Sequence, residues 1–241
     1  MIKLEKLRKT FAGRPVLRDL SFEAQDGAIT GLLGVNGAGK TTTLRTICGV
    51  LKADSGSVTI DREKAEIRSH QTQRKVGALL DHIGLYSRLT VRENLEYFGR
   101  LRGIRGQDLN RAVHRAISTL NLEAIADRPT AGFSQGERMK TALGRAILHS
   151  PKNLLLDEPT NGLDILTIRS LRELLKRLRD EGTCVIFSSH VLEEVHALCD
   201  TVVVISHGTI AGRGSAAELC SQTSTKCLED AFVQLTSTVE A

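Results

Sequence analysis

Residues 34–41 read Gly-Val-Asn-Gly-Ala-Gly-Lys-Thr, which is a complete G-x-x-x-x-G-K-[ST] pattern. Its glycines lack a Cβ, so the backbone can curl until several N–H groups point at one anion, beside the positive start of a helix. Lys40 would reach the outer phosphates, and the Thr41 hydroxyl would ligate Mg²⁺. The pattern predicts a nucleoside triphosphate site rather than a glycine-rich turn that holds nothing. Its expected contact residues are Asn36, Gly37, Ala38, Gly39, Lys40, Thr41 and Thr42.

Two adjacent carboxylates end an apolar run later in the chain, where residues 154–158 read Leu-Leu-Leu-Asp-Glu. Asp157 suits a Mg²⁺ contact because a hard cation prefers carboxylate oxygens. Glu158 would point to the other face of the strand and could orient or deprotonate an attacking water. Two acids at a strand end are by themselves more often solvated than catalytic. In a chain that also carries a phosphate loop, we expect them to serve its ligand.

Strands that alternate with helices are expected to position these residues, which favours a largely parallel sheet. The apolar run 28–33 precedes the loop, and residues 40–48 predict the helix after it. From 85 to 148 the apolar spacing is helical and opens with the capping-box pattern Thr90-x-x-Glu93. The other expected strands are 2–7, 16–22, 57–60, 76–80, 153–156, 184–187 and 202–205. The other expected helices are 166–179, 191–198, one that starts after Ser215, and 228–235, while 61–75 is expected to be a polar surface excursion.

The composition is that of an ordinary globular protein, since 41% of the 241 residues are hydrophobic and 25% are charged. The net charge of +5 fits a nearby anionic membrane surface, but a solvated surface explains it equally well. Only 3% of the residues are aromatic, so stacking on nucleic acid has few candidates. The five cysteines form no C-x-x-C pair, and we expect reduced thiols of a cytosolic protein. We expect neither a signal peptide nor a membrane-spanning segment.

Residues 133–137 read Phe-Ser-Gln-Gly-Glu and lead through a helical pattern to the carboxylate strand. Together with the phosphate loop before them, they make an order of motifs that resembles the ATP-binding cassette of ABC transporters over essentially the whole chain. The resemblance implies an α/β fold, with a P-loop NTPase (RecA-like) core, an antiparallel β subdomain and an inserted α-helical subdomain. The implied single domain has a core of residues 1–84 and 150–215, a helical signature subdomain of 85–149, and a C-terminal helical tail of 216–241.

Further site residues are implied by this resemblance. Ser134 and Gly136 match the family's signature motif, in which a helix start contacts the γ-phosphate of an ATP held by a second cassette. Asp164 belongs to a stretch similar to the D-loop, which crosses the dimer interface. His190 matches the switch histidine at the γ-phosphate, although a lone histidine at a strand end is usually structural or solvated. Phe11 stands where the family places an aromatic that stacks on adenine, and a core phenylalanine is the alternative.

The chain departs from the family at two positions that usually carry glutamine. Asp81 follows the expected strand 76–80, where a carboxylate can still hold Mg²⁺ or water but lacks the donor of an amide. Glu137 in the signature motif places a negative charge near the expected phosphate. The resemblance implies ATP and Mg²⁺ as cofactors, with Lys40, Glu158 and His190 as the catalytic groups and Thr41, Asp157 and Asp81 as the metal ligands.

Two stretches, 84–95 and 228–236, look like those of cassettes in ABC-2-type exporters, including sodium, drug and polysaccharide efflux systems, although helix amphipathicity also explains them. The leading hypothesis is the ATPase motor of an exporter, a homodimer around two Mg-ATP that drives a separate ABC-2-type permease. We expect it on the cytoplasmic face of the cell membrane, with the permease docked near Leu85 and Tyr86. The alternatives are a soluble cassette ATPase acting on ribosomes or DNA, and a nucleotide-sensing regulator with weak hydrolysis. No nucleic acid partner is expected.

Overall fold

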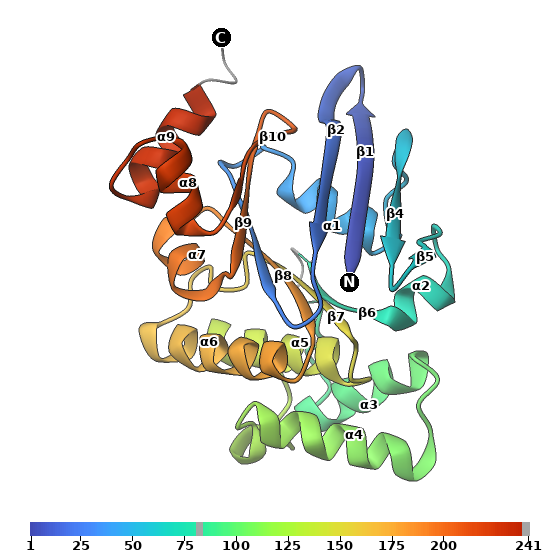
Figure 1. The fold of residues 1–241 in the computed structure, drawn as a ribbon. Coiled ribbons are helices and arrows are strands. Elements are labelled where there is room, and N and C mark those ends of the chain that lie inside the picture. The colour runs from blue at the N-terminus through green and yellow to red at the C-terminus, as the bar shows by residue number, and fades with distance from the viewer. Residues whose placement is uncertain (81–83, 238–241) are drawn as a thin grey trace.

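The computed structural model describes residues 1–80 and 84–237, which form two sheets with helices packed around them (Figure 1). Asp81, one of the expected metal ligands, lies outside the described residues. Figure 1 shows the two sheets beside each other in the upper part of the view, with the helices α3 (Val91–Leu101) and α4 (Gly106–Thr119) below them. The structure is therefore a mixed α/β fold, as the sequence predicts.

A six-stranded, largely parallel sheet forms the centre of the fold. Its strands are β3 (Ile29–Leu33), β6 (Val76–Leu79), β7 (Asn153–Asp157), β8 (Cys184–Ser189), β9 (Thr201–Ser206) and β10 (Thr209–Gly214). Their order is β10-β9-β3-β8-β7-β6, and only the edge strand β10 pairs antiparallel with its neighbour. Every residue of β3, β7 and β8 is buried, as in a parallel sheet covered on both faces. The carboxyl ends of the parallel strands therefore lie together at one edge of the sheet.

A second, antiparallel sheet covers one side of this core. It contains β1 (Ile2–Phe11), β2 (Arg14–Ala24), β4 (Ser55–Ile60) and β5 (Glu63–Lys64), in the order β2-β1-β4-β5. Buried and exposed residues alternate at the start of β1, which is the period of a strand with one covered face. Its apolar side chains share a core cluster with the helix α1 (Lys40–Ile47) and with one face of the central sheet. This antiparallel β layer is the predicted one.

Several of the helices around the central sheet begin at polar caps. A capping box opens α3 at Thr90 and Glu93, another opens α5 (Gln135–Ile147) at Ser134 and Glu137, and a third opens α8 (Ala216–Gln222) at Ser215 and Glu218. The remaining helical elements are η1 (Glu123–Ile125), α6 (Ile165–Asp180), α7 (Leu192–Leu198) and α9 (Leu228–Ser237). Within the part of the chain that the structure describes, no helix has the length and apolar content needed to cross a bilayer.

Three elements differ from the sequence prediction. The stretch expected as a polar excursion contains β5 and the short helix α2 (His70–Lys75), which the Ser69 side chain caps by accepting the Thr72 N–H. The strand β10 was not predicted, because two glycines interrupt its six residues and its side chains are only partly buried. Each of these elements is too short or too polar to give a clear periodic signal, and pairing with a neighbouring strand or a local cap stabilises it.

The buried side chain of Asn94 in α3 holds the segment that leads into the helices. Its amide nitrogen donates to the carbonyl oxygens of Tyr86, Leu89 and Thr90, at 3.1, 3.2 and 2.9 Å. Its amide oxygen accepts the Tyr86 N–H at 2.9 Å. One side chain of 1% exposure therefore bonds to four backbone groups of the segment that leads into α3, and it supplies the acceptor of the Tyr86 N–H.

We expect the substitution Asn94→Ala to lower the free energy of unfolding by about 1–3 kcal/mol, because the Tyr86 N–H loses its acceptor and a buried polar group left without a partner costs about that much. Urea denaturation followed by circular dichroism measures this change. The matched control is Asn110→Ala at an exposed position of α4, for which we expect a change below about 0.5 kcal/mol. Equal effects of the two substitutions would contradict the assigned role of Asn94.

Candidate active site

The loop between β3 and α1 forms a glycine-lined cradle. Gly37 and Gly39 have φ values of 84° and 111°, which other residues rarely adopt. A Cβ on Gly34 would lie 2.4 Å from the carbonyl oxygen of Ile205, so only glycine fits beside β9. The helix α1 begins at Lys40 with no side-chain cap and no acidic residue in its first turn. Its first N–H groups have no intrahelical acceptor, and this arrangement suits an anion.

The Lys40 ammonium lies over this cradle and is 5% exposed. It donates to the carbonyl oxygens of Gly34 and Val35, at 2.7 and 3.3 Å. It also lies 3.3 Å from Oε1 of Glu158, at the end of β7. The loop and the carboxylate strand, far apart in the sequence, therefore meet at one positive charge.

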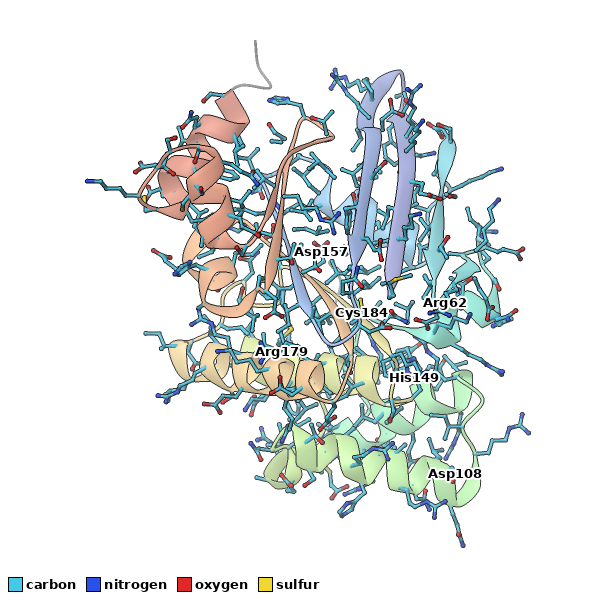
Figure 2. All side chains as sticks on the ribbon, in the orientation of Figure 1. Arg62, Asp108, His149, Asp157, Arg179 and Cys184 are labelled. Atoms are coloured by element: carbon cyan, nitrogen blue, oxygen red, sulfur yellow. The ribbon has the colours of Figure 1, made fainter. Side chains whose placement is uncertain are left out.

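The Asp157 carboxylate accepts hydrogen bonds from two hydroxyls on different elements. Thr41 Oγ1 on α1 donates to Asp157 Oδ2 at 2.6 Å, and Ser188 Oγ on β8 donates to Asp157 Oδ1. Figure 2 shows Asp157 in the two-sheet half of the molecule, away from Asp108 on α4. The hydroxyl and carboxylate oxygens are hard donors of the kind that Mg²⁺ takes. No group of three or more His, Cys, Asp or Glu gathers as a metal site among the described residues, and Mg²⁺ needs only one or two carboxylates beside phosphate oxygens and water.

Glu158 occupies a strained turn directly after β7. Its φ is 44°, in the left-handed region, and its N–H donates to Ser188 Oγ at 2.9 Å. Its Oε2 accepts from Asn161 Nδ2 at 2.6 Å and lies 3.1 Å from His190 Nδ1. Burial opposes the charged form, but the Lys40 ammonium and the His190 ring outweigh it and lower the pKa of the Glu158 carboxyl. The carboxylate is therefore ionised at neutral pH.

The serine-tipped start of α5 lies beside the turn that precedes α6. Ser134 Oγ accepts the Glu137 N–H at 3.2 Å, and the Glu137 carboxylate accepts the Ser134 N–H at 2.8 Å. Gln135 Nε2 donates to the Asn161 carbonyl oxygen at 2.6 Å. Asp164 caps α6 by accepting the Thr167 N–H at 2.9 Å, and bonds from Thr167 lower the pKa of the Asp164 carboxyl.

Within the described chain, no hydrogen bond or ion pair joins Ser134 or Gly136 to the cradle. A Cβ added at Gly136 would lie 3.2 Å from Thr167 Oγ1, so the α5 start packs against α6 instead.

Phe11 is 44% exposed at the end of β1, and the Lys9 ammonium lies 5.3 Å from its ring centroid. This exposure excludes the alternative that Phe11 is a core residue. Asp54 holds this corner by accepting from Lys9 Nζ and from the Thr10 N–H, each at 2.7 Å.

Several residues of this site were missed by the sequence reasoning. Ser188 and Asn161 bind the two acids directly. Glu194, 7% exposed on α7, accepts from Thr160 Oγ1 at 2.5 Å and from Ser189 Oγ at 3.1 Å, which ties the turn after Glu158 to the one before His190. The one available signal was the pair of polar residues that ends the apolar strand β8.

Comparison with known proteins identifies the family. The family model described as "ABC transporter" matches residues 17–161, more than half of the chain. The chain belongs to the ABC transporter family. It is an ATP-binding and ATP-hydrolysing subunit of the transporter motor type, and its fold is that of these cassettes.

Curated and solved relatives cover most of the cassette. It is 39% identical to the ABC transporter ATP-binding protein NatA of Bacillus subtilis, over 84% of this chain and 83% of that protein. It is 32% identical to the linearmycin resistance ATP-binding protein LnrL of the same species, over 98% of this chain and 75% of that protein. It is 37% identical to a sulfate/thiosulfate import ATP-binding protein of Chromobacterium violaceum, over 92% of this chain and 63% of that protein. A solved ATP-binding subunit of an ABC transporter matches with a TM-score of 0.89 and 26% identity, over 98% and 99% of the chains.

We expect Glu158→Gln to lower ATP turnover by about 10²–10⁴-fold while ATP binding persists, because the amide cannot accept a proton but keeps the size of the side chain. Phosphate release and equilibrium nucleotide titration measure the two quantities. The control is Glu173→Gln on α6, whose exposed carboxylate pairs with Arg169 at 3.5 Å. Near-normal turnover of the Glu158 variant would remove that residue from the reaction.

Proposed function

We propose that this cassette hydrolyses ATP with Mg²⁺ as the motor of an exporter, at the cytoplasmic face of the cell membrane and beside a separate permease. The observation that carries the proposal is the meeting of Lys40, Thr41, Asp157, Glu158 and His190 at the edge of the central sheet. Bound Mg²⁺ would supply positive charge at the phosphate oxygens, and Thr41 and Asp157 have the oxygen donors to hold it.

The cassette's own groups divide the work of hydrolysis. The cradle N–H groups and the Lys40 ammonium bind and orient the phosphates. Glu158, ionised and held by Asn161 and His190, accepts the proton of the attacking water at its carboxylate. His190 orients that carboxylate through the 3.1 Å contact. Phe11, exposed beside Lys9, offers its ring face to the base of the nucleotide.

The start of α5 is proposed to complete the site of a second cassette. Among the described residues, Ser134 and Gly136 make no hydrogen bond or ion pair with their own cradle, so a partner's phosphate would give them a ligand. Asp164, which caps α6, would lie in the stretch that crosses the interface between the two cassettes. The O–H of Ser134 remains available as a donor, because its oxygen accepts the Glu137 N–H and no acceptor for its proton occurs among the described residues. Two copies would then enclose two nucleotides, and contacts made only in the closed state would favour closure.

Ser134→Asp tests the second-cassette contact, because aspartate caps a helix as well as serine does but carries a charge that repels phosphate. In a Glu158→Gln background, we expect Mg-ATP to produce dimers, and the added Ser134→Asp to leave monomers that still bind nucleotide. Light scattering after size exclusion measures this difference. The control Ser215→Asp changes the matching cap of α8 and is expected to leave the dimer intact. Persistent dimers of the Ser134 variant would contradict the proposal.

An aromatic cluster supports the proposed permease contact. The rings of Tyr86 and Tyr97 lie 4.9 Å apart at their centroids and are 49% and 40% exposed. Phe98 lies 5.3 Å from Tyr97, and the Arg145 guanidinium lies 4.7 Å from the Phe98 ring. Tyr86 and Tyr97 are the exposed members of this cluster, and aromatic and arginine side chains are enriched at protein contacts. The ABC-2 type of the permease is supported by the stretches 84–95 and 228–236, and the linearmycin resistance relative fits export although a relative named for import also matches.

We expect the ATPase rate to rise when the cassette is reconstituted in vesicles with the multi-span membrane protein encoded beside it. Tyr86→Glu should remove this stimulation and leave the basal rate of the isolated cassette unchanged, because it places a charge in the contact. Leu101→Glu, at an exposed position of 65% on α3, is the matched control and should keep the stimulation. Stimulation by ribosomes or DNA, and none by the membrane protein, would favour the soluble alternative instead.

A further inference from the structure

Ser188 lies in the strand that separates the cradle from the two acids. The strand β8 pairs on one side with β3, which leads into the cradle, and on the other side with β7. Ser188 stands opposite Leu32 in β3 and opposite Asp157 in β7, and its side chain is fully buried. A polar side chain in this position has no solvent to bind, so its hydroxyl must be satisfied by the site itself.

The hydroxyl of Ser188 makes one bond to each acidic residue. It donates its proton to Asp157 Oδ1, while Thr41 Oγ1 donates to the other oxygen, Oδ2, at 2.6 Å. Both oxygens of that carboxylate therefore have a hydroxyl donor, one from α1 and one from β8. Two donors on opposite oxygens fix the plane of the carboxylate, which a single contact would leave free to rotate.

The same hydroxyl also supports the turn at Glu158. The Glu158 N–H donates to Ser188 Oγ at 2.9 Å and to the Ser188 carbonyl oxygen at 3.2 Å. The φ of 44° at Glu158 is costly for a side chain with a Cβ and persists only where the surroundings fix it. This turn brings the Glu158 carboxylate to Lys40 at 3.3 Å and to His190 at 3.1 Å.

We propose that Ser188 is a positioning residue for ATP hydrolysis, whose single hydroxyl sets the Asp157 carboxylate and the Glu158 turn relative to each other. The inference rests on the proposed roles of Asp157 and Glu158 in metal binding and proton transfer. Ser188 is buried and acts on the reaction only through its hydrogen bonds to Asp157 and Glu158. Removal of its hydroxyl leaves Asp157 with one fewer donor and Glu158 with one fewer acceptor, and neither can be replaced by water in a fully buried place.

The test compares Ser188→Ala with Ser188→Thr, which keeps a hydroxyl, and with Ser189→Ala in the same strand. The Ser189 hydroxyl bonds to Glu194 and accepts the Val191 N–H, and it contacts neither acid. We expect Ser188→Ala to lower kcat by about 10–100-fold, the usual effect of losing a group that orients a metal ligand. We expect Ser188→Thr to keep most of the kcat that Ser188→Ala loses. We expect Ser189→Ala to leave the gain in ATP affinity on adding Mg²⁺ unchanged.

A second readout uses binding rather than turnover. ATP affinity without metal should be the same in Ser188→Ala as in the unmodified cassette, whereas the gain in affinity on adding Mg²⁺ should fall by about tenfold. Ser188→Cys, close to serine in size but a weaker donor, should give an intermediate value and serves if the alanine variant does not fold. The inference would be overturned if Ser188→Ala or Ser188→Cys had the same kcat as the unmodified cassette and the same gain in ATP affinity on adding Mg²⁺. Normal turnover of Glu158→Gln would instead refute the proposed function on which it rests.

Discussion

The shared edge at which the parallel strands end is the constraint on which the rest of the structure depends. In this sheet Leu33 stands opposite Ser189, and Asp157 stands opposite Ser188. The chain that leaves β3 therefore enters the cradle next to the acids that end β7. Because side chains alternate between faces along a strand, a shift of one residue in this register would turn Asp157 away from Thr41. The complete burial of β3, β7 and β8 fixes the register, so packing of the core determines the geometry of the site.

Charges at this edge are held by neighbours of opposite sign or by dipoles, as buried charges must be. Lys40 is nearly inaccessible, yet it contacts two carbonyl oxygens and the Glu158 carboxylate. Glu158 in turn contacts Asn161 and His190. A triphosphate would offer Lys40 a stronger partner and leave the Glu158 carboxylate to water. If Glu158 has its proposed role as the base, the Lys40–Glu158 ion pair would link nucleotide binding to the availability of that base.

The sequence was informative where a local pattern carries the function. The cradle, the carboxylate pair and three helix starts each follow from residues that lie within a few positions of one another. Ser188 and Glu194 could not be found in this way, because their partners lie 31 and 34 residues away in the chain. A serine in a short apolar strand has no pattern that separates a structural from a functional role. Only the strand order and register place it between the two acids.

Glu137 shows how a departure from the family pattern can leave the start of α5 intact. The capping box needs an acceptor three residues after Ser134, and a glutamate supplies it as well as a glutamine. The Glu137 carboxylate accepts the Ser134 N–H and lies 4.0 Å from the Arg128 guanidinium. The helix start and this cation therefore offset part of its negative charge. The Ser134 oxygen still accepts the Glu137 N–H at 3.2 Å, so the cap on which the proposed anion contact depends is kept. The geometry at Glu137 gives no support to a regulator with weak hydrolysis, and it fits the ATPase assigned to this family.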